Sequence, residues 1–119
     1  MGVNQYTSKH IFEDLPDGGR IALERDDPAD TAAIRIIRSH MRDIADAFAR
    51  GDFSAPGAVH ATAVPGTDVM AARRSAITYA ASELPRGAEV RIRSSDPAVV
   101  SAVHAFLAFQ RSEHHAAGH

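Results

Sequence analysis

The chain contains one unit twice, and this duplication limits the possible folds more than any other feature. The segment Leu-Pro-Asp-Gly at residues 15–18 returns as Leu-Pro-Arg-Gly at residues 84–87, an offset of 69 residues. The triplet Asp-Pro-Ala at residues 27–29 returns at residues 96–98 with the same offset and no gap. Apolar residues between and beyond these anchors also match: Ile21 with Val90, Leu23 with Ile92, Ile34 with Val103 and Ile37 with Phe106. The sequence therefore predicts a fold built from two similar halves.

Each half begins with a predicted β-hairpin. Apolar and polar side chains alternate over residues 9–13 and 20–25, on either side of a Pro-Asp-Gly-Gly turn. The second half repeats this pattern over residues 77–81 and 89–93, around the turn at residues 84–87. A period of two is typical of strands that bury one face.

A helix is expected to follow each hairpin. In both halves an Asp-Pro pair supplies an N-cap carboxylate and a proline for the first helical position, at Asp27-Pro28 and at Asp96-Pro97. Apolar residues then recur every three or four positions, which predicts helices from residue 28 to about 50 and from residue 97 to about 113.

The predicted fold class is α+β, in the order ββα, insert, ββα. We expect one domain spanning residues 1–119, with the repeat at residues 9–50 and 77–115 and an insert at 51–76. Two hairpins that each precede a helix indicate a four-stranded antiparallel sheet with both helices on one face. Two separate lobes are the alternative, but lobes of about 45 residues are too small to be stable alone. Short helical turns are expected in the insert at residues 58–63 and 67–74.

Composition excludes several classes of protein. The chain has 119 residues, 45% of them apolar, and no cysteine, so it can form neither disulfides nor thiolate metal sites. A net charge of −2 without a basic stripe argues against nucleic acid as a partner. Neither a secretory leader nor a run of about 20 apolar residues is present, so we expect a cytoplasmic protein that does not enter the membrane.

The seven histidines are the main candidates for chemistry. His40 and His104 lie at the edges of the apolar stripes of the two helices, and His60 lies in an apolar part of the insert. His10 shares a strand face with Phe12, and His114 returns to the buried stripe if the second helix extends that far. Several histidines from different elements are thus expected to point inward.

Inward-facing imidazoles suggest a metal-ion or metal-cofactor site. Neutral imidazole is a common ligand of zinc, copper, iron and nickel, and three histidines with an open position form a recurrent site. The candidate ligands are His40, His60 and His104, with His10 and His114 as further candidates. No local metal motif such as His-Glu-x-x-His confirms the site.

Other functions are left open by the residues. The histidines can instead be structural, in a metal-free ligand-binding module or in an interaction module that forms a homodimer through the other face of the sheet. No catalytic constellation is identifiable: the Gly-x-Ser-x-Gly elbow, the phosphate-binding loop and the dinucleotide-binding turn are all missing from the sequence.

The motifs together resemble those of a family of small uncharacterised bacterial proteins that contain histidines at these places. The shared features are His-x-Phe at residue 10, the Leu-Pro-Asp-Gly-Gly turn, Asp-Pro-x-Asp at residue 27 and Gly-Asp-Phe at residue 51. They continue with Val59-His60, Pro65-Gly66, the second Leu-Pro-x-Gly-Ala turn and Val103-His104-Ala105-Phe106 followed by Gln110 and His114. His115 and His119 have no counterpart in the resemblance.

This resemblance implies no activity. Some members of the family carry an aspartate carbamoyltransferase label, which the present sequence contradicts. The chain is far shorter than such an enzyme and lacks the Ser-Thr-Arg-Thr loop that holds carbamoyl phosphate. The protein is therefore not expected to be a carbamoyltransferase.

Overall fold

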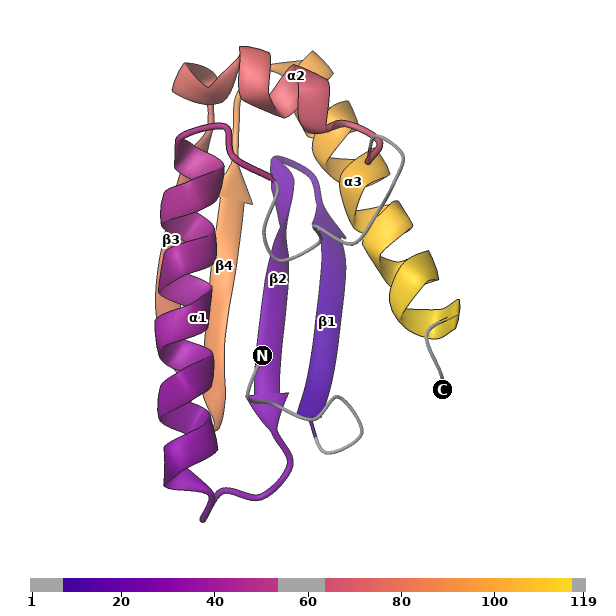
Figure 1. The fold of residues 1–119 in the computed structure, drawn as a ribbon. Helices are drawn as coiled ribbons and strands as arrows, with labels where there is room; N and C mark the ends of the chain where they lie inside the picture. Colours follow the sequence, from indigo (N-terminus) through magenta and orange to yellow (C-terminus); the bar gives the residue numbers. More distant parts are fainter. Residues whose placement is uncertain (1–7, 54–63, 117–119) are drawn as a thin grey trace.

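The computed structural model describes residues 8–53 and 64–116 (Figure 1). The first half consists of strands β1 (Ser8–Leu15) and β2 (Gly18–Arg25) and helix α1 (Thr31–Ala49). The insert contributes helix α2 (Thr67–Ala72) and a short 3-10 turn, η2 (Arg74–Ala76). The second half consists of strands β3 (Thr78–Leu84) and β4 (Gly87–Arg93) and helix α3 (Pro97–Ala116). The helical turn expected at residues 58–63 lies outside the described residues.

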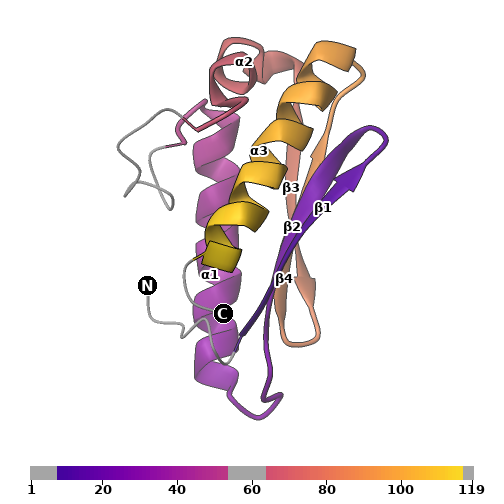
Figure 2. The same ribbon diagram turned by 90° about the vertical axis from the view of Figure 1, so that its right-hand side faces the viewer.

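The four strands form one antiparallel sheet in the order β1-β2-β4-β3. Both long helices lie on the same side of this sheet, and the other side is left uncovered by any described helix (Figure 2). The predicted α+β class, with a four-stranded antiparallel sheet and two helices on one face, is confirmed. None of the described helices combines the length and apolar character that spanning a lipid bilayer requires.

The sheet is organised around a pseudo-twofold axis. Ile21 pairs directly with Val90 at the junction of β2 and β4, and these two residues are counterparts at the offset of 69. The outer strands obey the same symmetry, because Phe12 pairs with Ile21 and its counterpart Ala81 pairs with Val90. The axis therefore passes through the Ile21–Val90 pair.

Backbone hydrogen bonds at both ends of the central strands repeat under this symmetry. The Arg25 amide donates to the Arg86 carbonyl at 2.8 Å, and the Ser94 amide donates to the Asp17 carbonyl at 2.9 Å. Arg25 and Ser94 are counterparts, and so are Asp17 and Arg86. Each hairpin turn is thus tied to the end of the other half's inner strand.

The repeated glycine of the Leu-Pro-x-Gly motif is explained by the close approach of β2 to β4. A Cβ atom at Gly18 would overlap the carbonyl oxygen of Ile92, and a Cβ at Gly87 would overlap that of Leu23. Leu23 and Ile92 are themselves counterparts. Both turns therefore require glycine for the same reason, which is the absence of space beside a backbone carbonyl.

Each helix packs mainly on the hairpin of the other half. α1, which follows β2, covers β3 and β4, and α3, which follows β4, covers β1 and β2. Gly19 shows this contact, because an added Cβ there would meet the side chains of Val103 and Leu107 from α3. Neither half buries its own apolar face, so the core exists only when both halves are in place.

The core lies between the helices and the sheet, and the insert closes one end of it. Its fully buried side chains come from both halves and from α2: Ile37, Met41, Met70, Val90, Ile92, Val99, Val103 and Leu107. Phe48 of α1 contacts Phe106 of α3 edge-on at 5.7 Å and Phe53 at 4.7 Å between ring centroids. Gly66, at φ +84°, lies against the backbone of Ala102, which fixes the start of α2 on α3.

Two helix ends differ from the sequence-based prediction. α1 begins at Thr31 rather than at residue 28, because the Asp30 carboxylate caps it by accepting from the Ala33 amide at 3.2 Å. Asp30 also pairs with Arg25 at 2.9 Å, which holds the cap in place. α3 begins at Pro97 as predicted but continues to Ala116, beyond the end expected near residue 113.

Candidate functional site

The described histidines lie on the helix-covered side of the molecule, but at separate places. His10 lies on β1 and pairs with the core residue Leu23 of β2. It is half-buried on the sheet face that the helices cover. His40 is half-buried on α1, and this burial lowers its pKa, while the nearby Asp43 acts in the opposite direction. Its imidazole is therefore neutral at pH 7. His60 lies outside the described residues.

His104 is fixed by a backbone carbonyl. Its Nε2 lies 2.7 Å from the carbonyl oxygen of Leu15, at the end of β1. Because a carbonyl only accepts, Nε2 carries the proton in this contact and the remaining ring nitrogen is Nδ1. The contact joins α3 to the first hairpin turn.

Arg38 makes the equivalent contact in the other half. From α1 its Nη2 donates to the carbonyl of Leu84 at 2.7 Å, and its Nε donates to the carbonyl of Gly87 at 3.0 Å. Leu84 is the counterpart of Leu15. Each covering helix thus sends one side chain to the leucine carbonyl of the turn beneath it, which gives His104 a structural role.

The described residues do not assemble the predicted multi-histidine site. Within residues 8–53 and 64–116, no group of three His, Asp or Glu side chains is placed to hold a metal ion. His104 lies at the first hairpin turn, while His40 lies on the helix over the second hairpin. The predicted set of His10, His40, His60, His104 and His114 therefore remains a prediction, since its completion depends on His60 and on the side chain of His114.

A cleft lies beside His104, at the end of the molecule where the first hairpin turn meets the start of α3. Its volume is about 500 Å³. One wall is the turn at Pro16 and Asp17, and the opposite wall is a face of α3 that includes Val100, Ser101 and His104. The link between β4 and α3, with Ser94 and Ser95, lines the cleft between them. We call this space the turn cleft.

Asp17, which lines the turn cleft, is paired with two arginines of β4. Its Oδ1 accepts from Arg91 Nη2 at 2.5 Å, and Arg93 Nε lies 3.9 Å from Oδ2. The hydrogen bond from Arg91 lowers the pKa of Asp17, so the carboxylate is ionised at neutral pH. The turn is thereby held against the open face of the sheet.

The Ser94 hydroxyl is engaged in hydrogen bonds with the backbone. Its hydroxyl donates to the Ala76 carbonyl at 2.8 Å and accepts from the Asp96 amide at 3.1 Å. Ser95 and Ser101 are exposed at the mouth of the cleft. The polar groups left for a ligand are therefore the Asp17 carboxylate, the His104 Nδ1 and these two hydroxyls.

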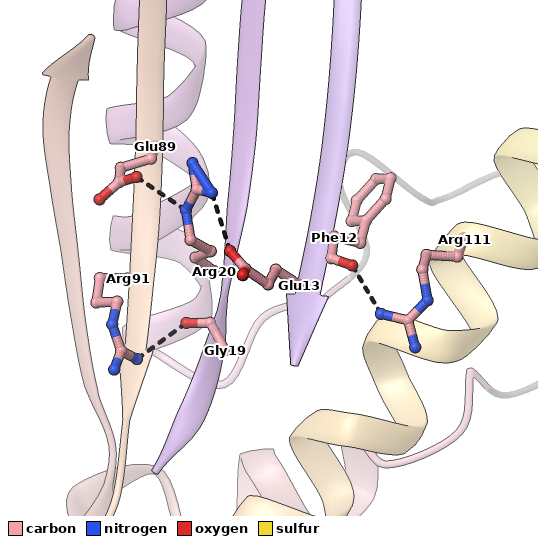
Figure 3. A network of polar contacts seen from close by, with 7 residues as sticks. All are labelled: Phe12, Glu13, Gly19, Arg20, Glu89, Arg91 and Arg111. Carbon is pink, nitrogen blue, oxygen red and sulfur yellow. Dashed lines mark hydrogen bonds and ion pairs between the residues drawn. The ribbon is translucent and has the colours of Figure 1, made fainter. Parts of the chain in front are cut away.

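The open face of the sheet carries paired charges (Figure 3). Arg20 lies between Glu13 at 3.0 Å and Glu89 at 3.1 Å, so one guanidinium joins three strands. Arg91 donates to the Gly19 carbonyl at 3.1 Å in the same row. Paired charges are costly to desolvate, so this face is suited to solvent more than to a dry interface.

Comparison with known proteins yields no relationship: no family model, no curated protein and no solved structure matches the chain. The structure itself shows a duplicated α+β domain with a polar cleft beside His104.

Sequence reasoning missed Arg38 and the turn cleft. In the sequence, Arg38 is one of several charged residues along the polar side of α1, and its contact with Leu84 depends on α1 crossing to the other half. The repeated Leu-Pro-x-Gly turn was the available signal, because identical turns bring identical free carbonyls that need donors.

The paired contacts of Arg38 and His104 generate a stability prediction. Arg38→Ala should lower the free energy of unfolding by about 1–3 kcal/mol, because two carbonyls lose a charged donor. His104→Ala should lower it by about 1 kcal/mol for the loss of one neutral hydrogen bond. Urea denaturation followed by circular dichroism measures both values.

Arg35→Ala is the matched control, since Arg35 lies three residues before Arg38 on α1 and is exposed. It should change the stability by less than about 0.5 kcal/mol. Equal losses for Arg38→Ala and Arg35→Ala would contradict the assigned role of Arg38.

Proposed function

We propose that the protein is a small-ligand-binding module and that its ligand occupies the turn cleft. The observation that carries this proposal is a concave space with apolar walls that is lined by Asp17, His104 and three serines. A volume of about 500 Å³ lies within the usual range for small-molecule sites, which is roughly 300–1,000 Å³. Pro16, Pro97 and Val100 supply apolar surface around the polar groups.

The polar groups of the cleft select a ligand that donates hydrogen bonds. The Asp17 carboxylate only accepts, and His104 keeps Nδ1 as its second ring nitrogen once Nε2 donates to Leu15. Arg91 and Arg93 compensate the charge of Asp17, so Asp17 contributes hydrogen-bond acceptors and not a net negative charge. The ligand class is therefore a small amine or polyol, with an apolar part that lies against Val100.

Binding is favoured over catalysis by the arrangement of the hydroxyl groups. A serine nucleophile requires an adjacent general base. Ser94 instead donates to the Ala76 carbonyl, and His104 is held by Leu15. Ser94 and His104 are thus engaged with backbone carbonyls, which supports a recognition role for the cleft.

Ligand titration followed by NMR tests this proposal. Ethanolamine or glycerol should perturb the amide signals of Asp17, Ser101 and His104, and acetate should leave them unchanged. Asp17→Asn should weaken binding of ethanolamine by about tenfold or more, because one charge-assisted hydrogen bond is lost. Asp68→Asn, an exposed carboxylate on α2, is the control and should bind as the wild type does.

Perturbations spread evenly over the surface, or equal affinity of the Asp17→Asn variant, would contradict a site in the turn cleft. Stronger perturbation by acetate than by ethanolamine would contradict the proposed ligand class.

We infer a transition-metal site at the remaining histidines as a second candidate function. α3 continues through residue 114, which meets the condition under which His114 was expected to join the site. Burial keeps His40 neutral, the form that ligates a metal. The candidate ligands of zinc, copper, iron or nickel are then His40, His60 and His114, with His10 as a fourth.

Equilibrium dialysis of untagged protein against Zn²⁺ tests the second candidate. Stoichiometric zinc is expected at pH 7.5, and less at pH 5.5, because imidazole must be deprotonated to bind. His40→Ala and His114→Ala should each remove the bound zinc, and His104→Ala should retain it. Substoichiometric zinc that none of these exchanges alters would count against a metal site.

A further inference from the structure

The sheet has two outer edges, formed by β1 and β3, and the pseudo-twofold axis makes them equivalent. Along β3 and β4, hydrogen-bonded pairs of residues alternate with pairs that are not hydrogen-bonded to each other. One set contains Leu84–Gly87, Ser82–Glu89 and Ala80–Arg91, and the other set contains the pairs of Glu83, Ala81 and Tyr79. Leu84 and Gly87 flank the two-residue turn, so the backbone groups of Leu84, Ser82 and Ala80 point to β4. The backbone amides and carbonyls of Tyr79, Ala81 and Glu83 consequently point away from the sheet.

The edge at β1 is occupied by α3. Arg111 Nη1 donates to the carbonyl of Phe12 at 2.7 Å (Figure 3), and it also contacts Asp14 Oδ1 at 3.1 Å. Phe12 is the counterpart of Ala81, and Arg111 is the counterpart of Arg42. A guanidinium over the strand prevents another strand from pairing there.

The equivalent edge at β3 lacks this protection. Arg42 is exposed, and its side chain makes no hydrogen bond to the Ala81 carbonyl within the described part of the chain. Ala80, Ala81 and Ser82 are small and exposed, and β3 contains no proline, lysine or arginine. Such a flat, uncharged centre is a template for pairing with another strand.

We propose that β3 pairs antiparallel with β3 of a second copy of this chain, across a twofold axis at Ala81. Tyr79 then pairs with the partner's Glu83, and the outward amides and carbonyls of both strands are satisfied. The result is one continuous sheet across two molecules. This interface differs from the open face of the sheet, whose charges are already paired within the molecule.

Charges on α1 complement this arrangement. Arg38 lies on the flank of α1 that faces β3, because its Nη1 is 3.6 Å from Glu83 Oε1. Arg42 and Asp46 follow at intervals of four residues on the exposed part of this flank. An antiparallel pair of α1 helices places Arg42 beside the partner's Asp46, so opposite charges meet twice across the axis.

Sedimentation equilibrium of the full-length chain, over a range of concentrations, tests this interface. The wild type should be a dimer. Ala81→Pro removes an amide that points outward, so it should raise the dimer dissociation constant by about tenfold or more while leaving the internal ladder intact. Ala81→Val keeps the amide and is the control, which should remain dimeric.

Charge reversal provides an independent test that does not alter the strand. Arg42→Glu and Asp46→Arg should each raise the dissociation constant, and the double variant should restore it. If circular dichroism shows that the Ala81→Pro variant does not fold, the charge-reversal variants alone test the interface. A monomeric wild type, a dimer unaffected by Ala81→Pro, or a double variant no tighter than the single variants would overturn the proposal.

Discussion

The pairing of β2 with β4 is the contact on which the rest of the structure depends. Ile21 and Val90 meet at the centre of the sheet, and the two hairpin turns are tied to the opposite inner strands by matching backbone hydrogen bonds. Only with this junction in place does α1 reach β3 and β4, and α3 reach β1 and β2. Because each helix covers the other half's hairpin, the hydrophobic burial that offsets chain entropy is shared between the halves. Each half of the duplicated fold therefore requires the other half for its own burial.

The candidate sites lie where the two halves differ. The leucine carbonyls of both turns need donors, and the chain supplies His104 in one half and Arg38 in the other. The turn cleft lies in the half with histidine, between Asp17 and α3. The edges differ in the same way, since Arg111 closes β1 and Arg42 leaves β3 open. Symmetry accounts for the frame, and different side-chain contacts on that frame account for the cleft and the proposed interface.

Much of the fold was predictable because the two copies align without a gap and each copy carries its own hairpin and helix patterns. Alternation around Leu-Pro-x-Gly predicted both hairpins, and the offset placed Ile21 and Val90 in matching positions. The start of α1 was predicted wrongly because Asp27-Pro28 looks like Asp96-Pro97, yet the Arg25–Asp30 ion pair moves the cap by three residues. The positions of the histidines relative to one another were harder to predict. Periodicity shows that His40 and His104 lie beside apolar stripes, but it does not show which hairpin each helix covers. Without that crossing, the separation of His40 from His104 and the contact of Arg38 with Leu84 could not be foreseen.

Residue-resolved amide hydrogen exchange of the Val103→Ala variant tests most directly whether the two halves depend on each other. Val103 is fully buried on α3, which covers the first hairpin, so its truncation should remove about 2 kcal/mol of stability. The account predicts that the opening free energy falls by the same amount for β2 amides bonded to β1 and for β4 amides bonded to β3. A loss confined to the first hairpin, with wild-type protection in β3 and β4, would contradict it.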